Sequence, residues 1–196
     1  MNKSFILVLA FLTVTTFVQA QTSSGNMMVG GAFQFTSVSR QANPNNSFSS
    51  FNFAPSFGYF ISDNFAVGTS LNLGTSRSGT GDAKTVVSIF GFGPFARYYL
   101  PTSSENFSFF GQAGVTFSSV TENPPIGPDS KSSSFSFLLS PGAAYFFNEH
   151  WALEFSVNLF RITTNDPDNA NDNDKTTTVD FGLTTLSPSL GFRYHF

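Results

Sequence analysis

Apolar and polar side chains alternate along most of the chain after residue 26, in runs of strand length. From Trp151 to Leu159, every odd position carries a large apolar side chain. The even positions of the same run include Glu154, Ser156 and Asn158. Because successive side chains of a β-strand point to opposite faces, a period of two predicts strands. We therefore predict an all-β protein whose strands have one large apolar face and one small polar face.

Runs of this kind follow one another along the chain and are separated by turn-rich segments. The connections alternate between short turns, such as "SDN" and "NEH", and long polar loops rich in Gly, Pro, Asn and Asp. An even number of antiparallel strands with short turns at one end and long loops at the other is the organisation of an outer-membrane barrel. Each run also has the roughly 9 to 11 residues that a tilted strand needs to cross the hydrocarbon layer. The runs span Met27–Ser39, Ser50–Ile61, Phe65–Thr75, Thr85–Leu100, Phe107–Val120, Ser133–Phe147, Trp151–Thr164 and Thr176–Phe196.

The alternation alone also fits a secreted lipocalin-like barrel, in which the rings fill the core and the polar stripe faces water. Charge placement favours the membrane. Only 11% of the residues are Asp, Glu, Lys or Arg, against about 25% in an average soluble domain, and most of these charges fall in loops and turns. Because charge near the bilayer midplane is costly on a lipid-facing surface, we predict an eight-stranded antiparallel up-and-down transmembrane β-barrel.

The beginning of the chain has the features of a targeting segment. Lys3 provides a positive charge, residues 5–18 are apolar, and "VQA" places small residues where a signal peptidase cleaves. The apolar run is shorter than the roughly 20 residues of a membrane-spanning helix, which disfavours an uncleaved anchor. We predict a cleaved signal peptide at residues 1–20, followed by an outer-membrane barrel domain at residues 21–196.

Three charged residues are predicted to lie inside the barrel: Arg97, Glu154 and Arg193. Each lies three residues from the short-turn end of its strand. Because side chains fill a barrel of this size, charges on different strands can meet across the lumen, where an unpaired charge would be strongly penalised. The cluster could be a structural polar core, which we favour because the lumen is narrow, or a gate for small solutes. Arg97 could instead extend to the membrane interface, since Phe95 and Tyr99 share its face.

Patterns for catalysis or metal binding are weak. Both histidines, His150 and His195, lie at the short-turn end of the predicted barrel, away from the rim at which a Ser–His pair could meet a substrate. The loop "NDPDNANDNDK" is acidic and compatible with calcium, but Ala170 stands where an EF-hand ligand is expected, and a flexible acidic loop is the simpler interpretation. We therefore expect no enzymatic activity, no cofactor and no bound metal.

Two local motifs point to a known family. The chain ends on "LGFRYHF", and the less specific "GPFARYYL" ends the fourth run. Together with the strand and loop pattern from Gln21 to Phe196, they resemble the small eight-stranded outer-membrane barrels, the OmpA-like and OmpX-like group called the outer membrane protein β-barrel domain. The resemblance implies that the final strand is recognised by the outer-membrane assembly machinery. The assembly signal would then be formed by Phe192, Tyr194 and Phe196.

These features predict an integral outer-membrane protein with a structural or surface-interaction role, long loops outside the cell and short turns in the periplasm. The expected partners are outer-membrane lipids, the assembly machinery and an extracellular partner bound through the loops. The net charge of −3 argues against a nucleic-acid partner, for which a basic patch is expected. Two alternatives stay open: a narrow or gated porin-like channel, favoured if water runs past Arg97 and Arg193, and a lipid-modifying enzyme.

Overall fold

The computed structural model describes residues 21–38, 47–79, 83–167, 175–182 and 188–196. The predicted signal peptide and the segments 39–46, 80–82, 168–174 and 183–187 lie outside the described residues. No helix in the described part is long and apolar enough to span a membrane. The strands are β1 (Met27–Val38), β2 (Phe48–Ser62), β3 (Phe65–Ser78), β4 (Thr85–Pro101), β5 (Phe107–Asn123), β6 (Ser130–Phe146), β7 (Trp151–Val157), β8 (Phe160–Pro167), β9 (Thr176–Phe181) and β10 (Pro188–His195).

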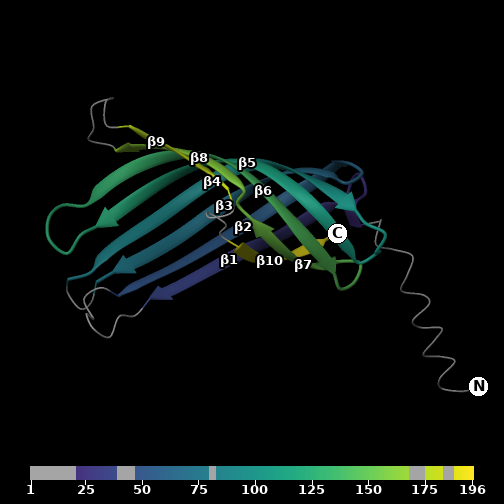
Figure 1. Cartoon of the computed structure of the whole chain (residues 1–196), viewed down its shortest axis with the longest axis horizontal. Helices are drawn as coiled ribbons and strands as arrows, with labels where there is room; N and C mark the ends of the chain where they lie inside the picture. Colours follow the sequence, from purple (N-terminus) through teal and green to yellow (C-terminus); the bar gives the residue numbers. More distant parts are fainter. Residues whose placement is uncertain (1–20, 39–46, 80–82, 168–174, 183–187) are drawn as a thin grey trace, which may run out of the picture.

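These strands form one antiparallel sheet that closes on itself (Figure 1). Each strand from β1 to β5 pairs with the next one along the chain, and β6 pairs with both β7 and β8. Since β7 and β8 pair with successive stretches of β6, they make up a single wall strand. β10 pairs with β7 and β9 pairs with β8, so β9 and β10 likewise make up one wall strand. The wall therefore has eight strands, and the predicted antiparallel up-and-down barrel is confirmed.

The two ends of the barrel carry different connections. At one end, which we call the turn end, short connections join β2 to β3, β4 to β5 and β6 to β7, and the C-terminus lies there as well (Figure 1). The opposite end, which we call the loop end, carries the connections from β1 to β2, β3 to β4, β5 to β6 and β8 to β9. The turn-end connections have two to five residues and the loop-end connections six to nine, so the predicted alternation is present. The contrast is smaller than the sequence predicts, because β3, β5 and β6 extend into two of the predicted loops.

Closure depends on the pairing of the first and last strands. β1 pairs with β10 from Met28↔His195 to Phe33↔Leu190. Next to this ladder, the amide of Met27 donates to the carbonyl of Phe196 at 2.7 Å, and the amide of Phe196 donates back to the carbonyl of Met27 at 3.0 Å. The terminal residue is thus hydrogen-bonded into the wall, which joins the two sheet edges along this seam.

A β-bulge lies between β7 and β8. On one side of it Gly142 of β6 faces Ser156, and on the other side Leu139 faces Phe160. Three steps along β6 thus correspond to four steps along its partner, so the partner contains one extra residue. The extra residue reverses the alternation: Phe160 packs on the outer face, and Arg161 lines the lumen.

The outer face of the barrel is apolar, and the inner face is apolar only near the turn end. Side chains such as Phe33, Phe92 and Phe192 point outward with about half of their surface exposed. Inside, near the turn end, large side chains are buried against one another, with ring centroids 5.5 to 5.9 Å apart in several pairs. We call this group the aromatic plug; its members are Met28, Phe60, Tyr99, Phe110, Phe146 and His195.

The segment before β1 lies across the turn end and covers the aromatic plug. The side-chain amide of Gln21 donates to the Asn148 carbonyl at 2.6 Å, and the Thr22 hydroxyl donates to Asn64 Oδ1 at 2.6 Å. The carbonyl oxygen of Gln21 also lies 3.2 Å from Nδ1 of His195. Because His195 is only 1% exposed beneath this segment, the lumen is closed at the turn end.

The substitution Phe92→Arg tests which solvent the outer face meets. Phe92 is 52% exposed near the middle of β4 and packs beside Phe117. In a bilayer, the new charge should lower the free energy of unfolding by about 2–4 kcal/mol, measured by urea titration of the barrel folded into lipid vesicles. The control Phe92→Leu stays apolar and should have a much smaller effect. An arginine variant as stable as the parent protein would mean that this face lies in water.

Candidate functional site

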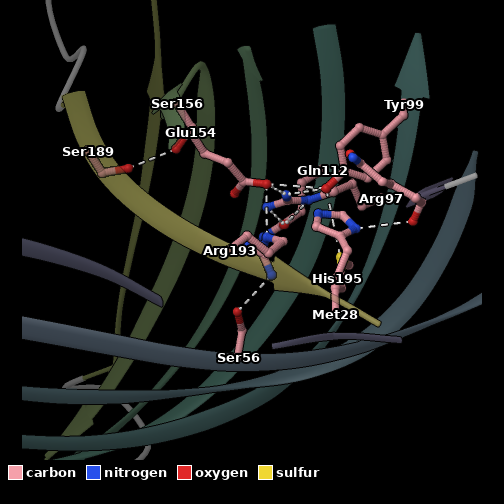
Figure 2. A network of polar contacts seen from close by, with 11 residues as sticks. Met28, Ser56, Arg97, Tyr99, Gln112, Glu154, Ser156, Ser189, Arg193 and His195 are labelled. Carbon is pink, nitrogen blue, oxygen red and sulfur yellow. Dashed lines mark hydrogen bonds and ion pairs between the residues drawn. The ribbon is translucent and has the colours of Figure 1, made fainter. Parts of the chain in front are cut away.

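Three charged side chains meet inside the barrel (Figure 2). They lie on the loop side of the aromatic plug, because Arg97 and Arg193 are two residues farther from the turn end of their strands than Tyr99 and His195. Arg97 comes from β4, Glu154 from β7 and Arg193 from β10. Glu154 Oε1 accepts from Nη1 of Arg97 at 2.5 Å and from Nε of Arg193 at 2.8 Å. The structure thus brings the three residues singled out in the sequence into one ion-paired network, which connects three different wall strands.

Arg97 is held from several sides. Its Nε and Nη2 donate to Gln112 Oε1 at 2.9 and 2.7 Å. Its Nη1 also donates to the Tyr99 hydroxyl at 3.0 Å. The guanidinium lies over the ring of Phe110, 4.1 Å from the ring centroid, in a cation–π contact. The side chain therefore lies inside the barrel rather than at the membrane interface, the other position considered for it from the sequence.

All members of the network are buried. Arg97, Glu154 and Arg193 are 4%, 5% and 5% exposed. Removing such charges from water is costly, and only close pairing with additional hydrogen bonds compensates for the loss of hydration. Arg193 makes one such bond, from Nη1 to the Ser56 hydroxyl at 3.1 Å. The three charges therefore depend on one another, because loss of one member leaves the others buried without their partner.

Toward the loop end, the network forms the floor of an open cavity, which we call the cup. The cup has a volume of about 460 Å³ and is lined by residues from β1 to β8 and from β10. Neutral polar side chains cover much of its wall, and some are already paired, such as Ser140 with Asn158 at 3.0 Å and Ser156 with Ser189 at 2.7 Å. The lumen thus consists of an apolar compartment, closed at the turn end, and a polar compartment, open toward the loop end.

Sequence reasoning missed Arg161 as a lining residue of the cup. It lies two positions after Leu159, on the stripe that strict alternation assigns to the outer face. The adjacent apolar pair Leu159 and Phe160 was the available signal that the alternation reverses there. Gln112 and Tyr99, which bind Arg97, gave no comparable signal, because single polar residues are common on every lumen-facing stripe of this chain.

The residues assigned to the assembly signal lie on the outer face, Phe192 and Tyr194 on β10 and Phe196 directly after it. Phe192 and Phe196 are 49% and 52% exposed. Between them, the ring of Tyr194 contacts those of His150, Trp151 and Phe196, with centroids 5.3, 5.1 and 5.9 Å apart. An aromatic group at the end of a barrel is typical of the girdle at a membrane interface. Recognition of these rings by the assembly machinery stays a prediction.

The described residues offer little for metal binding or acid–base chemistry. Among them, no group of three or more His, Asp or Glu residues could hold a metal ion. His195 belongs to the aromatic plug, and Nδ1 of His150 lies 2.9 Å from the His195 carbonyl oxygen. In the acidic loop, Asp166 pairs with Lys175 at 3.2 Å, and the remaining aspartates lie outside the described residues.

The sequence and the fold are similar to those of known outer-membrane proteins. The family described as outer membrane protein beta-barrel domain matches residues 5–185. Among solved structures, Neisserial surface protein A is similar over 88% of this chain and 98% of its own, with a TM-score of 0.55 and 18% identity. OprG from Pseudomonas aeruginosa is similar over 92% of this chain and 99% of its own, with a TM-score of 0.54 and 15% identity. No curated protein matches the sequence. At these identities the structural similarity concerns the fold.

The substitution Glu154→Gln should destabilise the barrel, because it leaves two buried guanidinium groups without a counter-charge. We expect the free energy of unfolding to fall by about 3–5 kcal/mol, read from urea titrations in lipid vesicles. The matched control is Glu122→Gln on β5, since Glu122 is exposed and an exposed charge contributes about 1 kcal/mol or less. Equal stability of the two variants would mean that the network contributes no more than a surface charge does.

Proposed function

This chain belongs to the outer membrane protein β-barrel domain family, and on that premise we propose that it is a non-enzymatic wall protein of the outer membrane whose loops provide a surface for interaction. The long loops face the outside of the cell, and the short turns face the periplasm. The barrel contributes to membrane integrity and holds the loops in place, as rigid scaffolds commonly do for recognition loops.

The closed turn end of the lumen is the observation that carries this proposal. Phe60, Tyr99 and Phe146 of the aromatic plug are at most 1% exposed, and the segment before β1 covers the plug. The charged network adds a second layer above these rings. Because both layers obstruct the lumen, the outer face and the loop end are the surfaces through which the barrel can act.

A narrow channel for small solutes is disfavoured by the same observation. Conduction requires a continuous water path, and the interior of an eight-stranded barrel is just wide enough for side chains to fill. The cup provides room for water only on the loop side of Arg97 and Arg193. The filled layers beneath them support a structural and surface role over a porin-like one.

A lipid-modifying enzyme is disfavoured for a chemical reason. General acid–base catalysis needs a proton donor or acceptor within hydrogen-bond reach of the substrate. In the described lining of the cup, Glu154 is the one acidic residue and no histidine is present. Two arginines already bind the Glu154 carboxylate, an arrangement that suits a structural ion pair better than a proton-transfer group.

Three kinds of partner fit the proposed function. Outer-membrane lipids would surround the apolar outer face, and the assembly machinery would bind Phe192, Tyr194 and Phe196 before the barrel closes. An extracellular partner would bind at the loop end, where Ile126 between β5 and β6 is 89% exposed. A nucleic-acid partner does not fit, because the chain is acidic and carries a net charge of −3.

Labelling of single cysteines on whole cells tests the proposed orientation. The chain contains no cysteine, so an introduced one reports without background. A polyethylene-glycol maleimide too large to cross the outer membrane should label Ile126→Cys at the loop end of intact cells. It should label Ser103→Cys at the turn end only after the membrane is permeabilised, and both positions are exposed. The reverse result would place the turns outside and contradict the proposal.

The substitution Phe196→Asp tests the proposed assembly signal. The change removes the terminal ring and places a charge beside the seam with Met27, so we expect a smaller assembled fraction in cells. That fraction is measured as the band that migrates differently on a gel before and after boiling. Ile126→Asp introduces the same charge in a loop and should assemble normally. If Phe196→Asp still refolds from urea into lipid vesicles, the loss arises in assembly; normal assembly in cells would show that the ring is dispensable.

A further inference from the structure

We propose that the cup is a binding site for a small carboxylate that carries several hydroxyl groups. The cup opens toward the loop end and has no role in the wall and surface function, so this site goes beyond that function. Its charge and its unpaired polar atoms point to this class of ligand, and its volume admits a molecule of that size.

The described lining of the cup carries an excess of positive charge. It contains Arg97, Arg161 and Arg193 but only one acidic residue, Glu154. Because the two floor arginines share Glu154, the floor has a surplus of about one positive charge, which suits a monoanion. Arg161 adds a charge from the wall. Its cross-strand neighbour Asp180 shares the inner face, but it does not line the cup, and no ion pair joins the two side chains among the described residues. A carboxylate is the small monoanion whose two oxygens match the parallel donors of a guanidinium.

Unpaired donors and acceptors lie on the floor beside these charges. Arg193 uses Nε for Glu154 and Nη1 for Ser56, which leaves Nη2 without a partner among the described residues. Glu154 accepts its hydrogen bonds at Oε1, and Oε2 accepts none from the described part of the chain. Gln112 likewise accepts only at Oε1, so its amide nitrogen is unused within that part. The floor thus offers donors to a carboxylate and an acceptor to a neighbouring hydroxyl.

Side-chain amides on the wall of the cup suit the hydroxyl groups of such a ligand. Asn52 on β2 and Asn72 on β3 both line the cup. The Oδ1 atom of each is buried and has no hydrogen-bond partner in the described protein. Because buried polar atoms are normally paired, these two amides have unused hydrogen-bonding capacity, and a turn of either side chain would bring its oxygen within reach of a ligand hydroxyl in the cup. A hydroxyl group can donate and accept at once, so a polyhydroxylated chain can bind amides and serine hydroxyls together.

The volume of the cup suits a small molecule, and its closed floor determines the end from which the ligand enters. A cavity of about 460 Å³ lies within the range of about 300–1,000 Å³ that is typical of small-molecule sites. The aromatic plug lies beneath the floor, so the ligand enters and leaves through the loop end. The site therefore binds a solute from the loop side without passing it through the barrel.

Gluconate and sorbitol are a matched pair of probes, because they share a hydroxylated chain and differ in the carboxylate. Each would be titrated into the isotope-labelled barrel in lipid nanodiscs, with amide NMR signals as the readout. Gluconate should cause saturable shifts confined to residues that line the cup. Sorbitol should bind about tenfold more weakly, because it lacks the charge that the guanidinium groups recognise. No saturable shift with gluconate, or equal affinity for the two probes, would overturn the proposal.

Arg161→Gln and Arg77→Gln remove the same charge inside and outside the cup. Arg77 is exposed on β3 and does not line the cup. Arg161→Gln should weaken gluconate binding about tenfold, and Arg77→Gln should leave it unchanged. Equal affinities of the two variants would show that gluconate binds elsewhere.

Two controls separate loss of gluconate binding from misfolding of a variant. Heat-dependent gel migration shows independently that each variant is folded, and the comparison of gluconate with sorbitol on the parent protein needs no variant. Gluconate binding does not depend on which end of the barrel faces outward. A failure of the binding site is therefore distinguishable from a failure of the proposed orientation, which cysteine labelling reports.

Discussion

A sheet edge in lipid has no water to bind its backbone groups, and the architecture of this protein follows from that constraint. The pairing of β1 with β10, extended by the two hydrogen bonds between Met27 and Phe196, joins the edges of the sheet. With eight strands in the wall, closure limits the lumen to the width that side chains can fill. The terminal ring is therefore a wall residue, and the contents of the lumen determine what the barrel can do.

The lumen contains three regions that follow one another along the barrel axis. The aromatic plug closes the turn end, the network of Arg97, Glu154 and Arg193 lies above it, and the cup opens beyond the network. The middle region has two roles, because the same charges link three wall strands and form the floor of the cup. Burial of these charges is tolerable only while they stay paired, which ties the stability of the wall to the integrity of that floor. A ligand bound in the cup, as proposed above, would therefore have no path through the barrel.

A single inserted residue shows how strongly local geometry affects the chemistry of the lumen. The bulge between β7 and β8 moves Phe160 to the outer face and Arg161 to the wall of the cup. Without it, the arginine would face lipid, where a charge is costly. The extra residue thus avoids an unfavourable contact on one face and increases the positive charge on the other. That charge distinguishes the cup from a neutral polar lining, and it underlies the class of ligand proposed for it.

The sequence by itself determined the strand number, the apolar outer face and the membrane as solvent, because alternation, loop length and charge placement are local properties of the chain. It also indicated the closing strand, through the alternating rings of "LGFRYHF". The charges of the network were indicated as well, since Arg97, Glu154 and Arg193 lie at equal distances from the turn end. Only the tertiary structure decided which atoms pair, that Tyr99 and Gln112 bind Arg97, and that Arg161 lines the cup. Contacts across a lumen depend on the register between strands that are distant in the chain, and a one-residue shift of register reverses the face of every following side chain. Local alternation does not contain that register.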